Sequence, residues 1–316
     1  MAKIIGPGSL IVDVTGFAPH LPVGGETVKG SKIRLGPGGK GSNQMTAAHR
    51  AGSEVCIISK RGSDALGNIL AEHYKNEGMT EKYVDVSPEY ETAGAFIEID
   101  ERDAQNRIIV VFGANELVTR ECVFAAEEDF KTADAVLTQF ETTVEAVFAA
   151  KELAKKYNKP FILNPAPFIE ISKEVFSEAD YITPNETEAE FFTGIKVETA
   201  EDCKSAALKF IEMGVKHVII TLGKRGAYYY DGEREITVPS IPVKAVETTG
   251  AGDAFNGGFA TAIAEGMDIE TALKFATATA AISVTRLGSS PSMPKREEIL
   301  ALMKKEFGLE IRGAKN

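Results

Sequence analysis

The sequence predicts an α/β fold in which helices cover both faces of a mostly parallel central sheet. Three observations support this fold class. Short apolar runs that are typical of strands alternate with segments of helical periodicity through most of the chain. A length of 316 residues and a hydrophobic content of 44% provide ample material for a core. No internal repeat or low-complexity linker divides the chain, so we expect one domain over residues 1–316.

The predicted strands are short and apolar. In chain order they cover residues 3–5 with 10–12, 55–59, 135–140, 161–163, 181–183, 217–222 and 241–246. The predicted helices repeat apolar side chains at helical spacing. They cover residues 42–50, 65–77, 143–157, 186–192, 200–213, 254–265 and 269–285. This alternation of strands and helices is the order that builds a parallel sheet.

Two segments break the alternation and read as antiparallel strands. They are residues 25–35 and 93–112, the second pairing 94–99 with 107–112 around a polar turn. Excursions of this kind from a parallel sheet often cover a site. We therefore expect a small β-sheet lid formed by about residues 14–37 and 92–113, with a surface hairpin of no function as the alternative.

Composition limits the partners and the location of the protein. A formal net charge of −11 argues against broad binding to nucleic acid or to an anionic membrane, because both require basic surface. Cys56, Cys122 and Cys203 show neither disulfide nor metal-ligand spacing and are expected to be reduced thiols. The sequence shows no signal peptide and no apolar run of about 18 residues. These features predict a cytoplasmic protein.

A glycine-rich run, ETTGAGDAFNGG, covers residues 247–258 and opens a predicted helix. Gly250 and Gly252 then lie at a helix N-terminus, where unpaired N–H groups and the helix dipole favour a bound anion. Asp253 follows directly and is placed to take a proton from an alcohol that attacks a phosphoryl group. The alternative is an ordinary helix that starts after a glycine turn.

A second glycine-rich run, GPGGKG, covers residues 36–41 and matches the G-x-G-x-x-G pattern of dinucleotide-binding folds. The context disfavours that interpretation, because Pro37 removes an N–H from the loop and the nearest acid, Glu54, begins the next strand instead of ending it. Lys40 and Asn43 can instead reach one ligand from the start of a helix, and a ligand with several hydroxyls suits this pair. The G-x-x-x-x-G-K-[ST] pattern is absent, which excludes a P-loop.

Polar residues follow several of the predicted strands. Asn185 and Glu188 share a helix face and are candidates for a water-bound magnesium ion beside phosphates, although a helix capping box explains the same spacing. The segment TLGKRG at residues 221–226 follows another strand, with a plain hairpin as the alternative. Glu141 and Asn164 also end strands. Because ligands of open α/β sheets bind beyond the carboxyl ends of the strands, these residues are expected to share one crevice.

Taken in order along nearly the whole chain, these motifs resemble the ribokinase family of sugar kinases, also called the phosphofructokinase B family. The first signature of that family resembles residues 38–44, and the second resembles residues 248–257. Between and after them, similar motifs stand at residues 164–167, 184–188, 221–223, 284–286 and 291–292. The resemblance implies a three-layer ribokinase-like fold with a small β lid that also forms a homodimer contact.

The resemblance implies transfer of the γ-phosphoryl group of ATP to the primary hydroxyl of a sugar, with D-ribose, giving ribose 5-phosphate, as the expected case. Asp253 would be the base. The backbone N–H groups of Gly250, Ala251 and Gly252 would stabilise charge on the transferred group. The alternatives are another pentose, a hexose or a nucleoside as substrate, or a non-catalytic sugar-binding regulator.

The resemblance also assigns binding residues. The sugar contacts would be Asp13, Gly39, Lys40, Asn43, Glu141 and Asp253. The nucleotide contacts would be Asn185, Thr221, Leu222, Gly223, Lys224, Arg225, Gly226, Gly252 and Thr277. Glu188 would help place magnesium through water. A monovalent cation, expected to be potassium, would be held by Glu247, Thr249, Ser283, Arg286, Gly288 and Ser292.

The chain departs from the family pattern at two positions. Ribokinases have Asn where this chain has Ile11, two residues before Asp13, so one sugar hydroxyl loses a partner. If the site is buried, that loss costs about 1–3 kcal/mol. At the monovalent-cation position the family has Asp and this chain has Glu247, whose extra methylene displaces the carboxylate.

Overall fold

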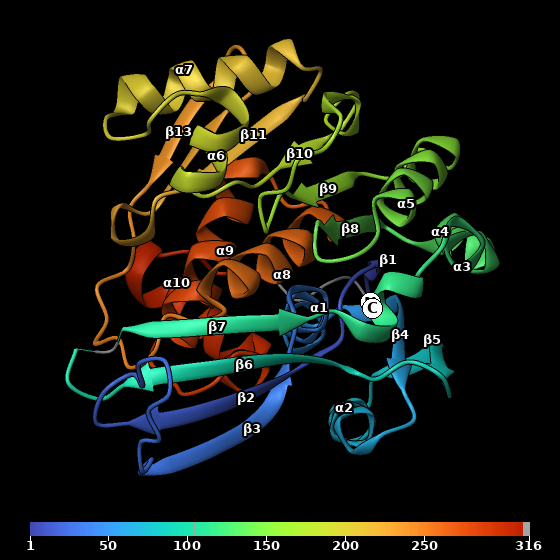
Figure 1. Ribbon diagram of the computed structural model, residues 1–316. Coiled ribbons are helices and arrows are strands. Elements are labelled where there is room, and N and C mark those ends of the chain that lie inside the picture. Colours follow the sequence, from blue (N-terminus) through green and yellow to red (C-terminus); the bar gives the residue numbers. More distant parts are fainter. Residues whose placement is uncertain (104, 312–316) are drawn as a thin grey trace.

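The computed structural model describes residues 1–103 and 105–311 and has the expected α/β architecture (Figure 1). The large sheet has nine strands in the order β13-β12-β11-β10-β9-β8-β1-β4-β5, all parallel to their neighbours except β12 and β13. Its strands are β1 (Lys3–Pro7), β4 (Glu54–Gly62), β5 (Thr80–Ser87), β8 (Ala135–Gln139), β9 (Phe161–Asn164), β10 (Tyr181–Ile182), β11 (His217–Thr221), β12 (Ala227–Tyr230) and β13 (Glu235–Val238).

Helices cover both faces of this sheet and bury its alternating side chains in two separate cores. On β1, Ile5 lies in one core and Ile4 in the other, as the two-residue period of a strand requires. The first core is covered by α3 (Arg120–Ala125), α4 (Glu127–Thr132), α5 (Val144–Lys156), α6 (Glu186–Thr193) and α7 (Ala200–Glu212). The second is covered by α1 (Lys40–Arg50), α2 (Ala65–Glu77), α8 (Ala251–Ala264), α9 (Ile269–Ser283) and α10 (Arg296–Phe307).

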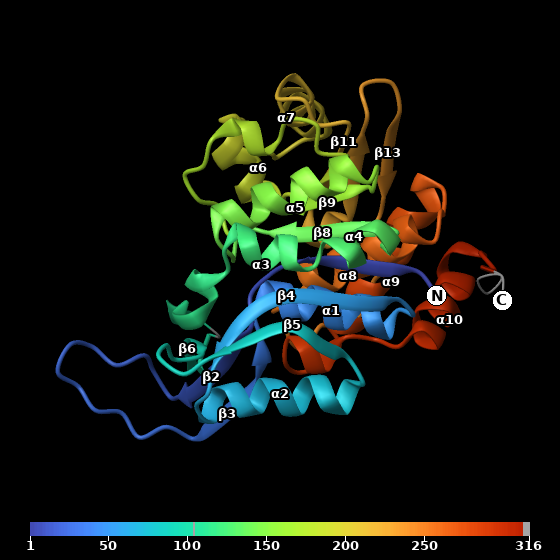
Figure 2. The same ribbon diagram turned by 90° about the vertical axis from the view of Figure 1, so that its right-hand side faces the viewer.

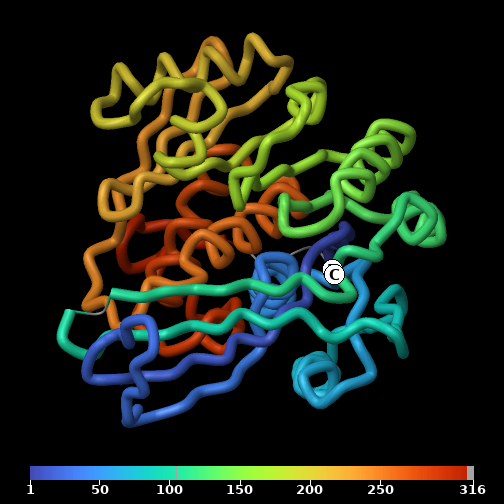
Figure 3. Tube along the Cα trace, in the orientation of Figure 1, coloured from blue at the N-terminus to red at the C-terminus, as the bar shows by residue number. Residues whose placement is uncertain are grey.

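A separate sheet of four strands lies at one side of the large one and matches the predicted lid. Its order is β3 (Lys32–Gly38), β2 (Ile11–Ala18), β6 (Ala93–Asp100) and β7 (Asn106–Val111). The predicted hairpin at 94–112 is confirmed as the antiparallel pair of β6 and β7, whereas β2 and β6 pair in parallel. Figure 3 shows these two distant chain segments side by side, and Figure 2 shows the loop between β2 and β3 projecting away from the body.

Three strand predictions need correction. Of residues 10–12, residues 11 and 12 begin β2 and so belong to the small sheet, not the large one. In the segment 25–35 the strand begins only at Lys32. Residues 241–246 form no strand, because residues 242–246 are solvent-exposed and no strand in the described part of the chain pairs with them. Strands β5 and β13 and helices α3, α4 and α10 were not predicted.

Helix α8 is the element that places the glycine-rich run against its neighbours. A Cβ on Gly257 would lie 2.4 Å from the backbone oxygen of Gln44, so only glycine lets α8 approach α1 this closely. The contact brings the first turn of α8 next to the first turn of α1. Residues 210 positions apart in the chain thereby form one polar cluster.

Candidate active site

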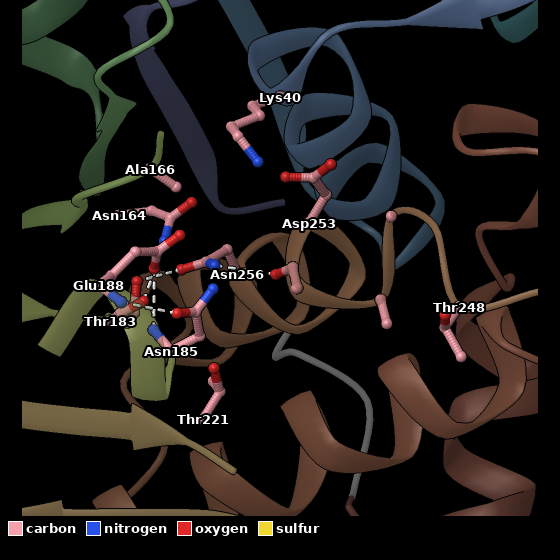
Figure 4. Close-up of a pocket in the computed structure, with 13 residues that line it drawn as sticks. Lys40, Asn164, Ala166, Thr183, Asn185, Glu188, Thr221, Thr248, Asp253 and Asn256 are labelled. Carbon is pink, nitrogen blue, oxygen red and sulfur yellow. Dashed lines mark hydrogen bonds between the residues drawn. The ribbon is translucent and has the colours of Figure 1, made fainter. Parts of the chain in front are cut away.

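A pocket of about 170 Å³ lies at the carboxyl ends of β9, β10 and β11, where the polar strand ends were predicted to meet. Several elements contribute its lining residues, which are Lys40, Asn164, Ala166, Thr183, Asn185, Glu188, Thr221, Thr248, Gly250, Ala251, Gly252, Asp253 and Asn256. Figure 4 shows Lys40 and Asp253 on one side of this pocket and Asn185 and Glu188 on the other.

The first turn of α8 forms the anion loop predicted from the sequence. Gly250 is the N-cap residue and has a φ of 79°, in the left-handed region that glycine adopts without strain. Glycine has no side chain to cap the helix, and the Ala251 N–H donates to the Thr248 oxygen at 3.2 Å. Among the described residues the N–H groups of Gly252 and Asp253 have no acceptor and are open to a ligand. Together with the helix dipole they make this end of α8 suited to negative charge.

The carboxylate of Asp253 is held at both oxygens by side chains of α1. Asn43 Nδ2 donates to Oδ2 at 2.9 Å, and Gln44 Nε2 donates to Oδ1 at 3.0 Å. Gln44 also donates to Asn164 Oδ1 at 3.0 Å, which links the cluster to the end of β9. All of these side chains are buried, so their hydrogen bonds fix the carboxylate in one orientation.

Lys40 is the first residue of α1, and its side chain reaches the same pocket. Burial alone would lower its pKa. The carboxylates of Asp253 and Glu141, with a smaller effect of Glu188, outweigh burial and raise the pKa of Lys40 above its ordinary value. The ammonium group therefore stays charged among three acidic side chains.

Two further acidic residues lie close to this cluster. Glu141 Oε2 accepts hydrogen bonds from Ser9 Oγ and from the backbone N–H of Lys40, both at 2.6 Å. Burial raises the pKa of Glu141 despite the nearby ammonium of Lys40. Burial also raises the pKa of Asp13 from its ordinary 3.8 to about 6, although Ser289 Oγ donates to its carboxylate at 3.1 Å.

On the opposite wall, Asn185 and Glu188 form the capping box that was the alternative to a metal-binding role. Asn185 Oδ1 accepts from the Glu188 N–H, and Glu188 Oε2 accepts from the Asn185 N–H, each at 2.8 Å. Both side chains nevertheless line the pocket, so the cap and a ligand role are compatible. Burial raises the pKa of Glu188.

Thr221 lines the pocket beside Asn185, whereas residues 222–226 lie outside its lining. The turn after β11 is followed by the hairpin to β12, as the alternative interpretation expected. Arg225 is engaged at the start of α6, where its Nη2 donates to Glu186 Oε1 at 2.8 Å. Thr277 is buried, and its Oγ1 has no hydrogen-bond partner among the described residues.

With this geometry in place, comparison with known proteins settles the family. A family model described as pfkB family carbohydrate kinase matches residues 1–296. The chain belongs to this family. It is therefore a sugar kinase, and the resemblance found in its motifs is confirmed.

Relatives of known name cover nearly the whole kinase. A ribokinase of Haemophilus influenzae is 37% identical over 296 residues, which are 94% of this chain and 96% of that protein. A deoxyribokinase of Salmonella typhi is 35% identical over 292 residues, 92% and 95% of the two chains. The structure of an Arabidopsis thaliana ribokinase complexed with ribose and ATP matches with a TM-score of 0.86 at 32% identity, covering 96% and 99%.

Two polar residues at the kinase pocket were not selected as site residues by the sequence analysis: Asn256, which lines the pocket, and Gln44, which lies buried behind Asp253. Gln44 and Asn256 both stand inside the quoted motifs, but nothing in the sequence shows which neighbour they bond. In the structure Asn256 Nδ2 donates to the Gly252 oxygen at 2.8 Å, and its Oδ1 accepts from Thr183. These bonds hold the anion loop against the end of β10.

At the position that the resemblance assigns to a monovalent cation, the carboxylate of Glu247 has hydrogen-bond donors from the kinase itself. Both oxygens of Glu247 accept hydrogen bonds from Arg34, at 2.9 and 3.0 Å, and Oε2 also accepts from the Gly288 N–H at 2.8 Å. Burial opposes ionisation, but these donors outweigh it and lower the pKa of Glu247. The carboxylate is thus occupied by N–H donors, an arrangement that does not fit a potassium ion bound to it.

The other residues were assigned to that cation through backbone or side-chain oxygens, and the Thr249 hydroxyl also helps to lower the pKa of Glu247. Thr249 is exposed, and the Arg286 guanidinium pairs with Glu298. Ser283 and Ser292 are buried and donate to backbone oxygens at 2.8 Å.

Proposed function

We propose that the chain catalyses ATP-dependent phosphorylation of the primary hydroxyl of a sugar, with D-ribose converted to ribose 5-phosphate. The observation that carries this proposal is the shared pocket of Asp253, Lys40 and the anion loop of residues 250–252. The names of the relatives, ribokinase above all, support the sugar, and the Arabidopsis thaliana complex with ribose and ATP supports both substrates.

In the proposed reaction, Asp253 accepts the proton of the attacking hydroxyl while that oxygen forms its bond to the γ-phosphorus and the ADP oxygen leaves. Its carboxylate is already oriented by Asn43 and Gln44. A positioned base supplies about 10²–10⁴-fold in rate. The backbone N–H groups of residues 250–252 and the ammonium of Lys40 stabilise the negative charge on the transferred group.

The wall formed by Asn185, Thr221 and Glu188 is proposed to receive the nucleotide, with residues 222–226 and Thr277 further along it. A magnesium ion bound with the phosphates would neutralise part of their charge, and Glu188 would hold it through water. One oxygen of Glu188 is taken by the Asn185 N–H. No hydrogen bond from the described residues reaches the other oxygen, which suits a water ligand.

The sugar is proposed to lie among Asp13, Gly39, Lys40, Asn43 and Glu141. Ile11 favours a second candidate, deoxyribose. Ile11 is 1% exposed and packs with Ala93 and Ala95 near Gly39, and its apolar side chain cannot hydrogen-bond to a sugar hydroxyl. A sugar with one hydroxyl fewer avoids the cost of about 1–3 kcal/mol for an unpaired buried group. A deoxyribokinase is among the relatives.

ADP production measured with ribose, deoxyribose, hexoses and nucleosides tests both candidates. The proposed function predicts sugar-dependent ADP release, and deoxyribose preferred over ribose would select the second candidate. Ile11→Asn is expected to shift preference toward ribose, while Ile11→Val, which adds no hydrogen-bonding group, should leave it unchanged. Release of ADP that no sugar increases would instead indicate the sugar-binding regulator.

We further propose that residues 1–316 act as one kinase domain and that the small sheet, at about 14–37 and 92–113, joins two copies. One cross-strand row of the sheet exposes Leu35, Phe96 and Ile109, at 48%, 46% and 68%. Apolar rows of this kind are typical of interfaces. Sedimentation should show that the wild type is a dimer and that Ile109→Lys weakens this dimer. A wild type that sediments as a monomer would contradict the proposal.

No helix in the described ranges 1–103 and 105–311 is long and apolar enough to cross a membrane. Cys56, Cys122 and Cys203 are free thiols, which supports the proposed cytoplasmic location. The family resemblance predicts activation by potassium. The hydrogen-bond donors around the Glu247 carboxylate instead favour a kinase that does not need this ion.

A further inference from the structure

The carboxylate of Glu247 binds a guanidinium at the position that the family resemblance assigns to a monovalent cation. Arg34 Nη1 donates to Oε2 at 3.0 Å, and Nη2 donates to Oε1 at 2.9 Å. This bidentate, or two-pronged, pairing is the strongest arrangement of arginine with a carboxylate. With the Gly288 N–H added, each oxygen already has a donor.

The ion pair stands directly beside the anion loop. Glu247 precedes Gly250 by three residues, and Gly288 precedes Ser289, which touches the loop: a Cβ on Gly250 would lie 3.3 Å from the Cα of Ser289. A carboxylate without a counter-charge at this place would repel the phosphates that the loop receives. The guanidinium of Arg34 cancels that charge.

Arg34 itself is fixed in the small sheet. It lies on β3 opposite Thr15 of β2, and its guanidinium carbon is 5.8 Å from the centre of the Phe17 ring. The side chains of Arg34 and Glu247 are only 25% and 17% exposed, so water and salt screen the pair less than a surface pair. Because Arg34 belongs to β3, its hydrogen bonds to Glu247 tie the small sheet to the segment that precedes the anion loop.

We propose that Arg34 is a built-in cation, whose guanidinium takes the place of the monovalent ion beside the anion loop and makes phosphoryl transfer independent of potassium. Arg34 is then a positioning residue that holds Glu247, the Gly288 segment and the small sheet together. The inference rests on the proposed kinase reaction, but its binding and melting measurements below do not require turnover.

The test compares potassium with tetramethylammonium at equal ionic strength in three measurements: ADP production, calorimetric binding of a non-hydrolysable ATP analogue, and thermal unfolding. For the wild type, we expect the activity, analogue Kd and Tm to be nearly the same in both salts. Arg34→Gln is expected to lose about tenfold or more in activity and analogue affinity without potassium and to regain both with it, together with a potassium-dependent rise in Tm.

Lys32→Gln is the matched control, because Lys32 lies on the same strand and its Nζ is 5.6 Å from the centre of the same Phe17 ring. It removes an equal charge, makes no contact with Glu247 and should stay independent of potassium. Arg34→Lys keeps the charge but not the two-pronged geometry, and should recover most of the potassium independence.

Strong potassium stimulation of the wild type would overturn the inference, and so would equal potassium responses of Arg34→Gln and Lys32→Gln. If Arg34→Gln does not unfold cooperatively, the wild type and Arg34→Lys decide. Absence of sugar-dependent ADP production in every variant would overturn the proposed reaction, while analogue binding and unfolding would still report on the cation.

Discussion

The two walls of the pocket are built in different ways. On the wall of α1 and α8, Asn43, Gln44 and Asp253 are buried at 5%, 0% and 7% exposure, and the first two each donate a hydrogen bond to the Asp253 carboxylate. On the wall of α6 and β11, Asn185 is exposed and Thr221 is half-buried, and their contacts are mainly helix-cap and backbone contacts.

The difference between the two walls predicts different effects for substitutions on each. A buried polar network is stable only when every member keeps its partner, because an unpaired group in the interior costs about 1–3 kcal/mol. An exposed cap loses a bond that water replaces in part. We therefore expect changes on the first wall to damage stability and turnover together, and changes on the second to affect mainly nucleotide binding.

The largest effect is expected from Asp253→Asn. The substitution removes the proposed base, so kcat should fall by roughly 100- to 10,000-fold. It also turns an amide N–H₂ toward the donors Asn43 and Gln44, so Tm should decrease. Steady-state kinetics and thermal unfolding measure both. The control is Asp268→Asn, which makes the same change at the exposed N-cap of α9. If Asp253→Asn kept a kcat within a few fold of wild type, the assignment of Asp253 as the base would be contradicted.

Gln44→Ala is expected to come second. It leaves Asp253 Oδ1 and Asn164 Oδ1 without their donor, at a cost of about 1–3 kcal/mol in the free energy of unfolding. Turnover should fall with it, since the carboxylate is no longer held at both oxygens. Gln139 is equally buried, but its amide has no partner among the described residues.

Gln139→Ala is therefore a control for lost volume without lost hydrogen bonds. Denaturant unfolding of the two variants should show the larger loss for Gln44→Ala. Equal losses, with kcat unchanged in both, would mean that the network does not position Asp253.

On the other wall, Asn185→Ala should have a smaller and different effect. It removes the cap of α6 and about 0.5–2 kcal/mol of stability, and it should raise KM for ATP with little change in kcat. Thr199 caps α7 with the same type of capping box but lies outside the pocket. Thr199→Ala should lose similar stability and leave KM for ATP unchanged. If Thr199→Ala raised KM for ATP as much as Asn185→Ala does, Asn185 would have only a structural role.

The smallest expected effect concerns pH. Because burial raises the pKa of Asp13 to about 6, the sugar-binding ionised form is lost as pH falls through 6, and kcat/KM for the sugar should fall with it. Stability moves the opposite way: the native carboxyl holds its proton more tightly than the unfolded one, so the contribution of Asp13 decreases as pH rises from about 4 to 6.

Ser289→Ala removes the hydroxyl that lowers the pKa of Asp13 and should move the acidic limb of the kcat/KM profile to higher pH. Ser31→Ala, in the exposed loop before β3, is the control. An acidic limb that stays in place in Ser289→Ala would show that another group titrates there.

Local patterns account for the parts of the fold and site that could be predicted. The inner strands of the large sheet, such as β8 and β9, are buried on both faces and read as apolar runs, whereas the edge strands β5 and β13 are partly exposed. The glycine-rich run before α8 marks the N-terminus of that helix from neighbouring residues alone. Residues 241–246 show where this fails. Their apolar pattern suits a strand, but a strand also needs a partner, and none of the strands within residues 1–103 and 105–311 pairs with this segment.

The fold class, the polar ends of the strands β9 and β11 and the motif residues of the kinase can be predicted from residue order, because each depends on spacing within short stretches. The partner of each polar group depends instead on how the elements pack. Gln44 bonds Asp253 across 209 positions, and Arg34 bonds Glu247 across 213. Such pairings are set by the packing of α8 on α1 and of the small sheet against the anion loop, and no local pattern specifies the partner.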